Sequence, residues 1–137
     1  MSRSLTLRVY YEDTDLAGIV YYANYLRFIE RGRTEYVRAA GIDQTRLKAE
    51  TGIVFAVRRV EADYILPARF DDVLEVRTAV SSIGGARLVM AQEVRRGDTV
   101  LFSADVTLVA LHDDGRPARL PAEIRQALTR DGASRGG

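Results

Sequence analysis

Residues 10–41, which read YYEDTDLAGIVYYANYLRFIERGRTEYVRAAG, decide the fold expected for this chain. The stretch begins as a strand, turns at a segment that carries Asp13, Asp15 and Gly18, and enters a helix at residue 23 or 24. The helix is expected to continue to Gly41. A turn rich in carboxylates therefore lies against the start of a helix.

Local signals at both ends predict this helix. Asn24 is a candidate N-cap, whose side-chain oxygen can accept a backbone N–H of the first turn, and Gly41 is a natural left-handed stop. Between them apolar residues recur at helical spacing: Tyr25, Leu26, Phe28, Ile29, Tyr36, Val37 and Ala40. A helix of about 17 residues is roughly 25 Å long, and its apolar stripe requires a sheet to pack on.

The remainder of the chain reads mainly as strands separated by turns. A first strand alternates over residues 5–10, and a short helix capped by Asp43 is expected over residues 42–50. The four longer strands cover residues 53–66, 73–83, 87–95 and 99–111, and glycines between the last three indicate tight antiparallel hairpins. A helix over residues 122–130 and a frayed tail over residues 131–137 follow. We expect one α+β domain over residues 1–130, in which a curved antiparallel sheet wraps a long central helix.

The composition excludes several classes of function. The formal charge is +1, from 20 basic and 19 acidic residues, so no overall field attracts nucleic acid or anionic lipid. The chain has no cysteine and one histidine, His112, so thiolate chemistry, a histidine-centred zinc site and a Ser-His-Asp triad are not expected. No apolar run is long enough for a signal peptide or a membrane span, which predicts a cytoplasmic protein.

Asp15 is the first candidate for chemistry because its turn leads into a helix N-terminus, where unpaired N–H groups stabilise an oxyanion. A carboxylate there can attack a carbonyl or activate water, and Gly18 would let the backbone approach a substrate closely. The structural alternative is that Asp13 and Asp15 only make Asx-turns or caps, and the residue types alone favour it. The two carboxylates match a metal site poorly, so no metal is expected.

Four other charged residues could contribute to a site. Glu30 or Glu35 on the helix could act as a general base, but a glutamate among helical arginines usually forms an i,i+3 or i,i+4 pair. Arg58 and Arg59 point to opposite faces of their strand, so at most one of them faces a given site. A ligand rich in phosphate could use such an arginine.

Two runs of sequence resemble one family. YYEDTDLAGIVYYANYLRFIERGRTEY is similar to the signature of hotdog-fold acyl-CoA thioesterases of the 4-hydroxybenzoyl-CoA thioesterase type, and most to their bacterial Tol-Pal-associated branch. VRRVEADYILPARFDDVLEV resembles the same branch, and the likeness extends to about Ala110. The resemblance implies a hotdog fold, hydrolysis of acyl-CoA to free acid and coenzyme A without a cofactor, and dimers that usually pair into tetramers. The mixed outer face of the strand over residues 99–111 also indicates contact with another subunit.

The resemblance also implies roles for individual residues. Asp15 is the expected catalytic carboxylate, as nucleophile or as general base, and the backbone N–H of Tyr22 is the expected donor to the thioester carbonyl. Many relatives carry histidine at the Tyr22 position, so this sequence departs from them there. The expected substrate contacts are Gly18, Ile19, Val20, Tyr21, Asn24, Tyr25, Arg58 and Arg59. The alternatives are a hotdog hydrolase that uses Glu30 or Glu35, and a non-catalytic module that binds acyl groups or a protein.

Overall fold

The computed structural model of the chain describes residues 2–133. Its elements in chain order are β1 (Ser2–Arg8), the single 3₁₀ turn η1 (Tyr11–Asp13), α1 (Asn24–Ala39), α2 (Gln44–Thr51), β2 (Val54–Tyr64), β3 (Val73–Ile83), β4 (Arg87–Arg96), β5 (Thr99–Leu111) and α3 (Ala122–Ala133). The predicted α+β class is confirmed, and the bounds predicted for β3 and β5 coincide with those observed. α3 continues three residues past its predicted end, so residues 131–133 are helical and not part of a tail. The rest of the predicted tail, residues 134–137, lies outside the described residues.

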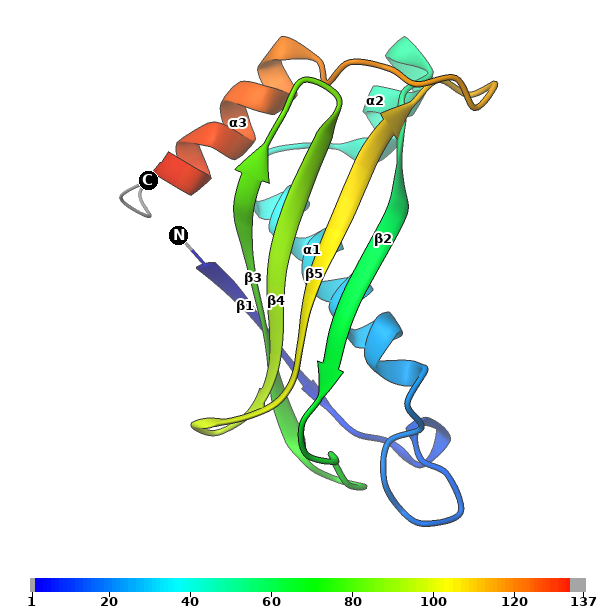
Figure 1. Cartoon of the computed structure of the whole chain (residues 1–137), viewed down its shortest axis with the longest axis vertical. Coiled ribbons are helices and arrows are strands. Elements are labelled where there is room, and N and C mark those ends of the chain that lie inside the picture. The colour runs from blue at the N-terminus through cyan, green and yellow to red at the C-terminus, as the bar shows by residue number, and fades with distance from the viewer. Residues whose placement is uncertain (1, 134–137) are drawn as a thin grey trace.

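The five strands form one antiparallel sheet in the order β1-β3-β4-β5-β2. Tight turns join β3 to β4 and β4 to β5, as the glycines predicted. At the two edges β1 pairs with β3, and β2 pairs with β5. The sheet curves across α1, which runs behind it in Figure 1, and the loops after β1 and β2 meet at the lower end of the molecule. β2 is therefore an edge strand that ends beside the start of α1.

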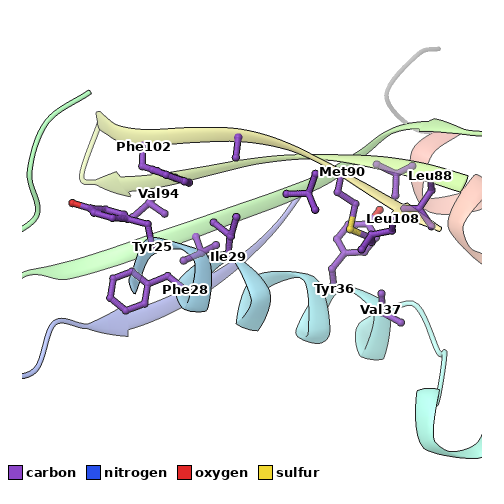
Figure 2. Close-up of a cluster of buried hydrophobic side chains, with 14 of the residues drawn as sticks. Tyr25, Phe28, Ile29, Tyr36, Val37, Leu88, Met90, Val94, Phe102 and Leu108 are labelled. Atoms are coloured by element: carbon purple, nitrogen blue, oxygen red, sulfur yellow. The ribbon is translucent and has the colours of Figure 1, made fainter. Parts of the chain in front are cut away.

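α1 buries one face against the sheet. Its buried residues are Tyr25, Phe28, Ile29, Gly32, Tyr36 and Val37. All but Gly32 belong to the predicted stripe, whose other two members differ: Leu26 is exposed and Ala40 is only partly buried. Figure 2 shows Tyr25, Ile29 and Tyr36 on the side of α1 that faces Leu88, Met90, Val94, Phe102 and Leu108 of the sheet. Gly41 adopts the left-handed conformation expected of a helix stop, with φ of 90°. The helix is thus held on the sheet by a mainly apolar interface.

A buried polar cluster interrupts this interface near the middle of α1. Gln92 of β4 donates from Nε2 to the Ile29 carbonyl and to Thr78 Oγ1, each at 2.8 Å, and accepts from Arg33 Nη1 at 3.1 Å. Burial lowers the pKa of the Arg33 guanidinium, and the nearby Glu30 opposes that shift. Because Gly32 has no side chain, the helix approaches the sheet closely enough for these bonds to form.

No helix within residues 2–133 is both long enough and apolar enough to cross a membrane.

Candidate active site

The Asp15 turn is a short closed loop between β1 and α1. The Asp15 N–H donates to the Ile19 carbonyl at 2.9 Å, and the Gly18 N–H donates to the Asp15 carbonyl at 3.0 Å. The Ala17 N–H donates to Asp15 Oδ1 at 2.9 Å, which is the Asx-turn that the structural alternative predicted. Gly18 has φ of 79°, a left-handed conformation that side chains disfavour. The Asp15 carboxylate is exposed in the single chain.

The loop after β2 holds this turn from the other side. The Val20 N–H donates to the Ala68 carbonyl at 2.8 Å, and Ile19 forms an isolated antiparallel bridge with Arg69. Val20 and Ala68 are both buried. The Asp15 turn is therefore held to a segment about fifty residues away in the sequence.

The start of α1 leaves backbone amides free, among them those of Tyr22 and Ala23. The carbonyl of Asp13 accepts from the Tyr21 N–H at 3.0 Å and from Asn24 Nδ2 at 2.9 Å, and the Asn24 N–H donates to the Tyr21 carbonyl at 2.8 Å. The prediction that Asn24 caps the helix is wrong, because its side chain donates to Asp13 and Ala23 occupies the N-cap position. Within residues 2–133, the N–H groups of Tyr22 and Ala23 have no acceptor. Free amides at a helix start are the arrangement that binds an oxyanion.

Aromatic side chains lie beside these free amides. The Tyr64 hydroxyl donates to the Tyr22 carbonyl at 3.0 Å, and the Tyr25 hydroxyl accepts from the Ala68 N–H at 2.9 Å. The rings of Tyr25 and Phe102 are stacked with centroids 5.0 Å apart, as Figure 2 shows. Burial is the main cause that raises the pKa of both Tyr25 and Tyr64. Both hydroxyls therefore keep their protons at neutral pH.

The structure gathers most of the predicted site residues in one place. Those brought together around the turn and the start of α1 are Asp15, Gly18, Ile19, Val20, Tyr21, Tyr22, Asn24 and Tyr25. Arg58 and Arg59 lie elsewhere, because they precede Tyr64 by five or six residues on β2, which is roughly 20 Å at the strand rise. Arg58 lies at a bulge of β2, and Arg59 pairs with Glu61 at 3.3 Å. In the single chain, the two arginines do not reach the Asp15 turn.

The two glutamates of the alternative interpretation lie on the exposed face of α1. Glu30 accepts a hydrogen bond from the Thr34 hydroxyl at 2.7 Å, and Glu35 forms the i,i+3 ion pair with Arg38 that was expected of it. Across the described part of the chain, no group of three or more His, Asp or Glu side chains is placed to hold a metal ion. The Asp15 turn is therefore the arrangement best suited to chemistry.

Residues 64–68 contribute to the site without any local sequence signal. The run around Tyr64 and Ala68 resembles the thioesterase family, but nothing in it indicates that the Tyr64 hydroxyl contacts the start of α1. The buried pair Thr78 and Gln92 was also missed. A signal did exist there, because each is a polar residue at an inward position of an alternating strand.

Comparison with known proteins identifies the class. The Thioesterase superfamily (4HBT) pattern matches residues 17–103, and the chain belongs to this superfamily. Among its relatives, "Acyl-CoA thioesterase YbgC" of Haemophilus influenzae is 41% identical over 127 residues, covering 91% of this chain and 93% of the relative. YbgC is the Tol-Pal-associated thioesterase, so the predicted branch is confirmed.

Solved structures agree with this assignment. A probable thioesterase from Bartonella henselae is 37% identical with a TM-score of 0.85, covering 88% of this chain and all of that one. A mutant 4-hydroxybenzoyl-CoA thioesterase complexed with 4-hydroxybenzoyl-CoA is 27% identical with a TM-score of 0.87, covering 93% of this chain and 98% of that one. The fold is the hotdog fold, as the resemblance implied.

Proposed function

We propose that the protein hydrolyses an acyl-CoA thioester to a free carboxylic acid and coenzyme A, with Asp15 as the catalytic carboxylate and the Tyr22 amide as the oxyanion donor. The observation that carries the proposal is the free N–H groups of Tyr22 and Ala23 at the start of α1, directly after the Asp15 turn. The names of the relatives as acyl-CoA thioesterases support the reaction class.

The chemistry requires few groups. A thioester carbonyl is electrophilic and its thiolate leaves readily, so a carboxylate and an oxyanion hole suffice. The carbonyl oxygen, held by the Tyr22 amide, takes up the negative charge as the carbon is attacked. If Asp15 is a general base, it removes a proton from the attacking water. If it is a nucleophile, its oxygen bonds to the acyl carbon, the thiolate leaves, and water then cleaves the mixed anhydride. The Ala17 N–H fixes one carboxylate oxygen, so the other is available in either route.

Arg58 and Arg59 stay proposed contacts for the phosphates of coenzyme A. Both are exposed on the edge strand β2, and guanidinium groups bind phosphate through paired hydrogen bonds. A cytoplasmic location and the single domain over residues 1–130 stay predictions of the sequence.

We further propose that two copies dimerise through β2, and that dimers pair through the outer face of the sheet. The edge of β2 carries unpaired backbone groups, and Val57, Val60 and Tyr64 on it are 47%, 38% and 48% exposed. An open apolar edge of this kind favours pairing with a second strand. Small residues, Ala79, Ala91 and Ser103, line a hollow on the outer face, which would let two sheets approach. Light scattering tests the β2 interface: Val60→Lys should halve the molar mass of the assembly, while Thr45→Lys on α2 should not change it.

The decisive experiment measures release of coenzyme A from a panel of aromatic and aliphatic acyl-CoAs. Asp15→Asn should lower kcat by about 100-fold or more for the best substrate, while Glu30→Gln and Glu35→Gln should retain it. Loss in a glutamate variant, with Asp15→Asn active, would support the alternative hydrolase. Acyl-CoA binding without turnover by the wild type would instead support a non-catalytic binding module.

A further inference from the structure

The turn that opens α1 has a middle peptide whose orientation decides where the free amides point. The Asn24 N–H donates to the Tyr21 carbonyl at 2.8 Å, so residues 21–24 form a β-turn with Tyr22 and Ala23 at its centre. Ala23 has φ of −70° and ψ of −21°, which excludes the type II turn, where this residue needs a positive φ. The type I and type II turns differ by a flip of the middle peptide, which joins the Tyr22 carbonyl to the Ala23 N–H. Such a flip would reverse the direction of the Ala23 amide.

One side chain holds that peptide. The Tyr64 hydroxyl donates to the Tyr22 carbonyl at 3.0 Å, so a flip would break this bond. A hydrogen bond to an amide carbonyl also polarises the N–H at the other end of the same peptide, and hydrogen bonds in series strengthen one another. The contact therefore acts on both the direction and the donor strength of the Ala23 amide.

The Tyr64 ring is itself well placed to hold its hydroxyl still. It packs edge-on against Tyr25 and Phe102, with centroids 5.5 Å and 4.9 Å away, and both of those rings are buried. Tyr25 is in turn fixed by the bond from the Ala68 N–H to its hydroxyl. Tyr64 is the last residue of β2, so the edge strand reaches the start of α1 through this side chain.

We propose that Tyr64 is a positioning residue for the oxyanion hole: its hydroxyl locks the peptide between Tyr22 and Ala23, so that the Ala23 amide stays aimed at the substrate carbonyl beside the Tyr22 amide. The inference rests on the proposed thioesterase function and extends it. It adds the Ala23 amide as a second donor and gives the edge strand a role in the chemistry. In this role Tyr64 acts through the turn and not by contact with the reacting carbonyl.

The test removes the hydroxyl and keeps the ring. Tyr64→Phe should lower kcat by about threefold to tenfold, the effect of one hydrogen bond between uncharged groups. KM and the thermal midpoint should stay at their wild-type values, because the aromatic contacts remain. The matched control is Tyr11→Phe, which removes a hydroxyl from a tyrosine that is 84% exposed at the same end of the molecule. Its kinetic constants should not change.

A spectroscopic measurement separates positioning from general stability. Asp15→Asn protein is loaded with an acyl-CoA labelled with ¹³C at the thioester carbonyl, and the infrared carbonyl stretch is compared with that in water. Binding should move the stretch to lower frequency, and adding Tyr64→Phe should reverse part of that shift.

The outcomes distinguish the two proposals. An active wild type with unchanged kcat and carbonyl shift in Tyr64→Phe overturns the role of Tyr64 alone. A loss of kcat explained by a lower thermal midpoint or a higher KM also overturns it. A wild type that hydrolyses no acyl-CoA overturns both proposals.

Discussion

Replacing Gly32 by alanine tests the closest approach between α1 and the sheet. A Cβ built at Gly32 would lie 2.7 Å from Val76 Cγ1, 2.9 Å from Thr78 Oγ1 and 3.2 Å from Gln92 Nε2. The first two distances are shorter than any ordinary Cβ contact, and all three atoms belong to buried side chains. The helix must therefore move away from the sheet, or these side chains must move.

The change in the free energy of unfolding expected for Gly32→Ala is the sum of opposing effects. Alanine in a helix interior is favoured over glycine by about 1 kcal/mol. Overpacking of a core costs about 1–3 kcal/mol, and disturbing the buried hydrogen bonds of Gln92 costs about 1–3 kcal/mol more. The sum predicts that Gly32→Ala lowers the free energy of unfolding by roughly 1–5 kcal/mol.

Chemical denaturation at one fixed protein concentration measures this change. A double-mutant cycle supplies the control: Val76→Ala removes the nearest methyl group, so Gly32→Ala should cost about 1 kcal/mol less in that background. If Gly32→Ala raised the free energy of unfolding by the amount expected of helix propensity alone, the close approach would be refuted.

Substitutions at three further positions test the buried polar cluster around Gln92, the oxyanion donor and the Asp15 turn. Gln92→Leu leaves the Thr78 hydroxyl and the Arg33 guanidinium without their partner, so denaturation should show that the free energy of unfolding falls by about 2–3 kcal/mol. An unchanged free energy of unfolding would mean that the buried cluster does not stabilise the fold. Tyr22→His should keep kcat within about threefold of wild type, because a backbone amide is the proposed donor; a tenfold change in steady-state assays would assign the role to the side chain. Gly18→Ala should lower the free energy of unfolding by about 1–2 kcal/mol, because residue 18 has a positive φ. Gly18→Asn should lower it less, because asparagine tolerates that conformation. Equal losses in the two variants, measured by denaturation, would show that the positive φ is not the cause.

The helices and strands were largely predictable because their signals are local. The 3.6-residue period of the stripe from Tyr25 to Val37 and the glycines of the two hairpins each lie within one segment of chain. The sheet order was not predictable in the same way. The pairing of β2 with β5 joins residues about fifty positions apart, and no local pattern specifies such a partner. The bulge at Arg58 likewise depends on that pairing.

In the candidate site too, features set by adjacent residues were predictable from the sequence, and features set by distant residues were not. The sequence placed Asp15 and Tyr22 beside a helix start, because the turn and the helix adjoin one another. It assigned the wrong role to Asn24, because an asparagine amide can accept or donate, and the Asp13 carbonyl that decides this is positioned only by the folded turn. The Tyr64 hydroxyl comes from a strand that begins thirty residues further along, so only the fold could bring it to the Tyr22 carbonyl.

The close approach of α1 to the sheet at Gly32 and the free amides at the start of α1 are mechanically connected. Gly32 follows Asn24 by eight residues, which is about 12 Å along a helix that moves as a rod. If alanine at Gly32 pushes the middle of α1 off the sheet, the rod tilts and the amides at its start change direction. Gly32→Ala should therefore lower kcat in protein that is still folded. Leu128→Ala in α3, where the side chain is 1% exposed, should cost about 2–5 kcal/mol of stability and leave kcat unchanged. An equal loss of kcat in both variants would show that activity follows overall stability and not the direction of α1.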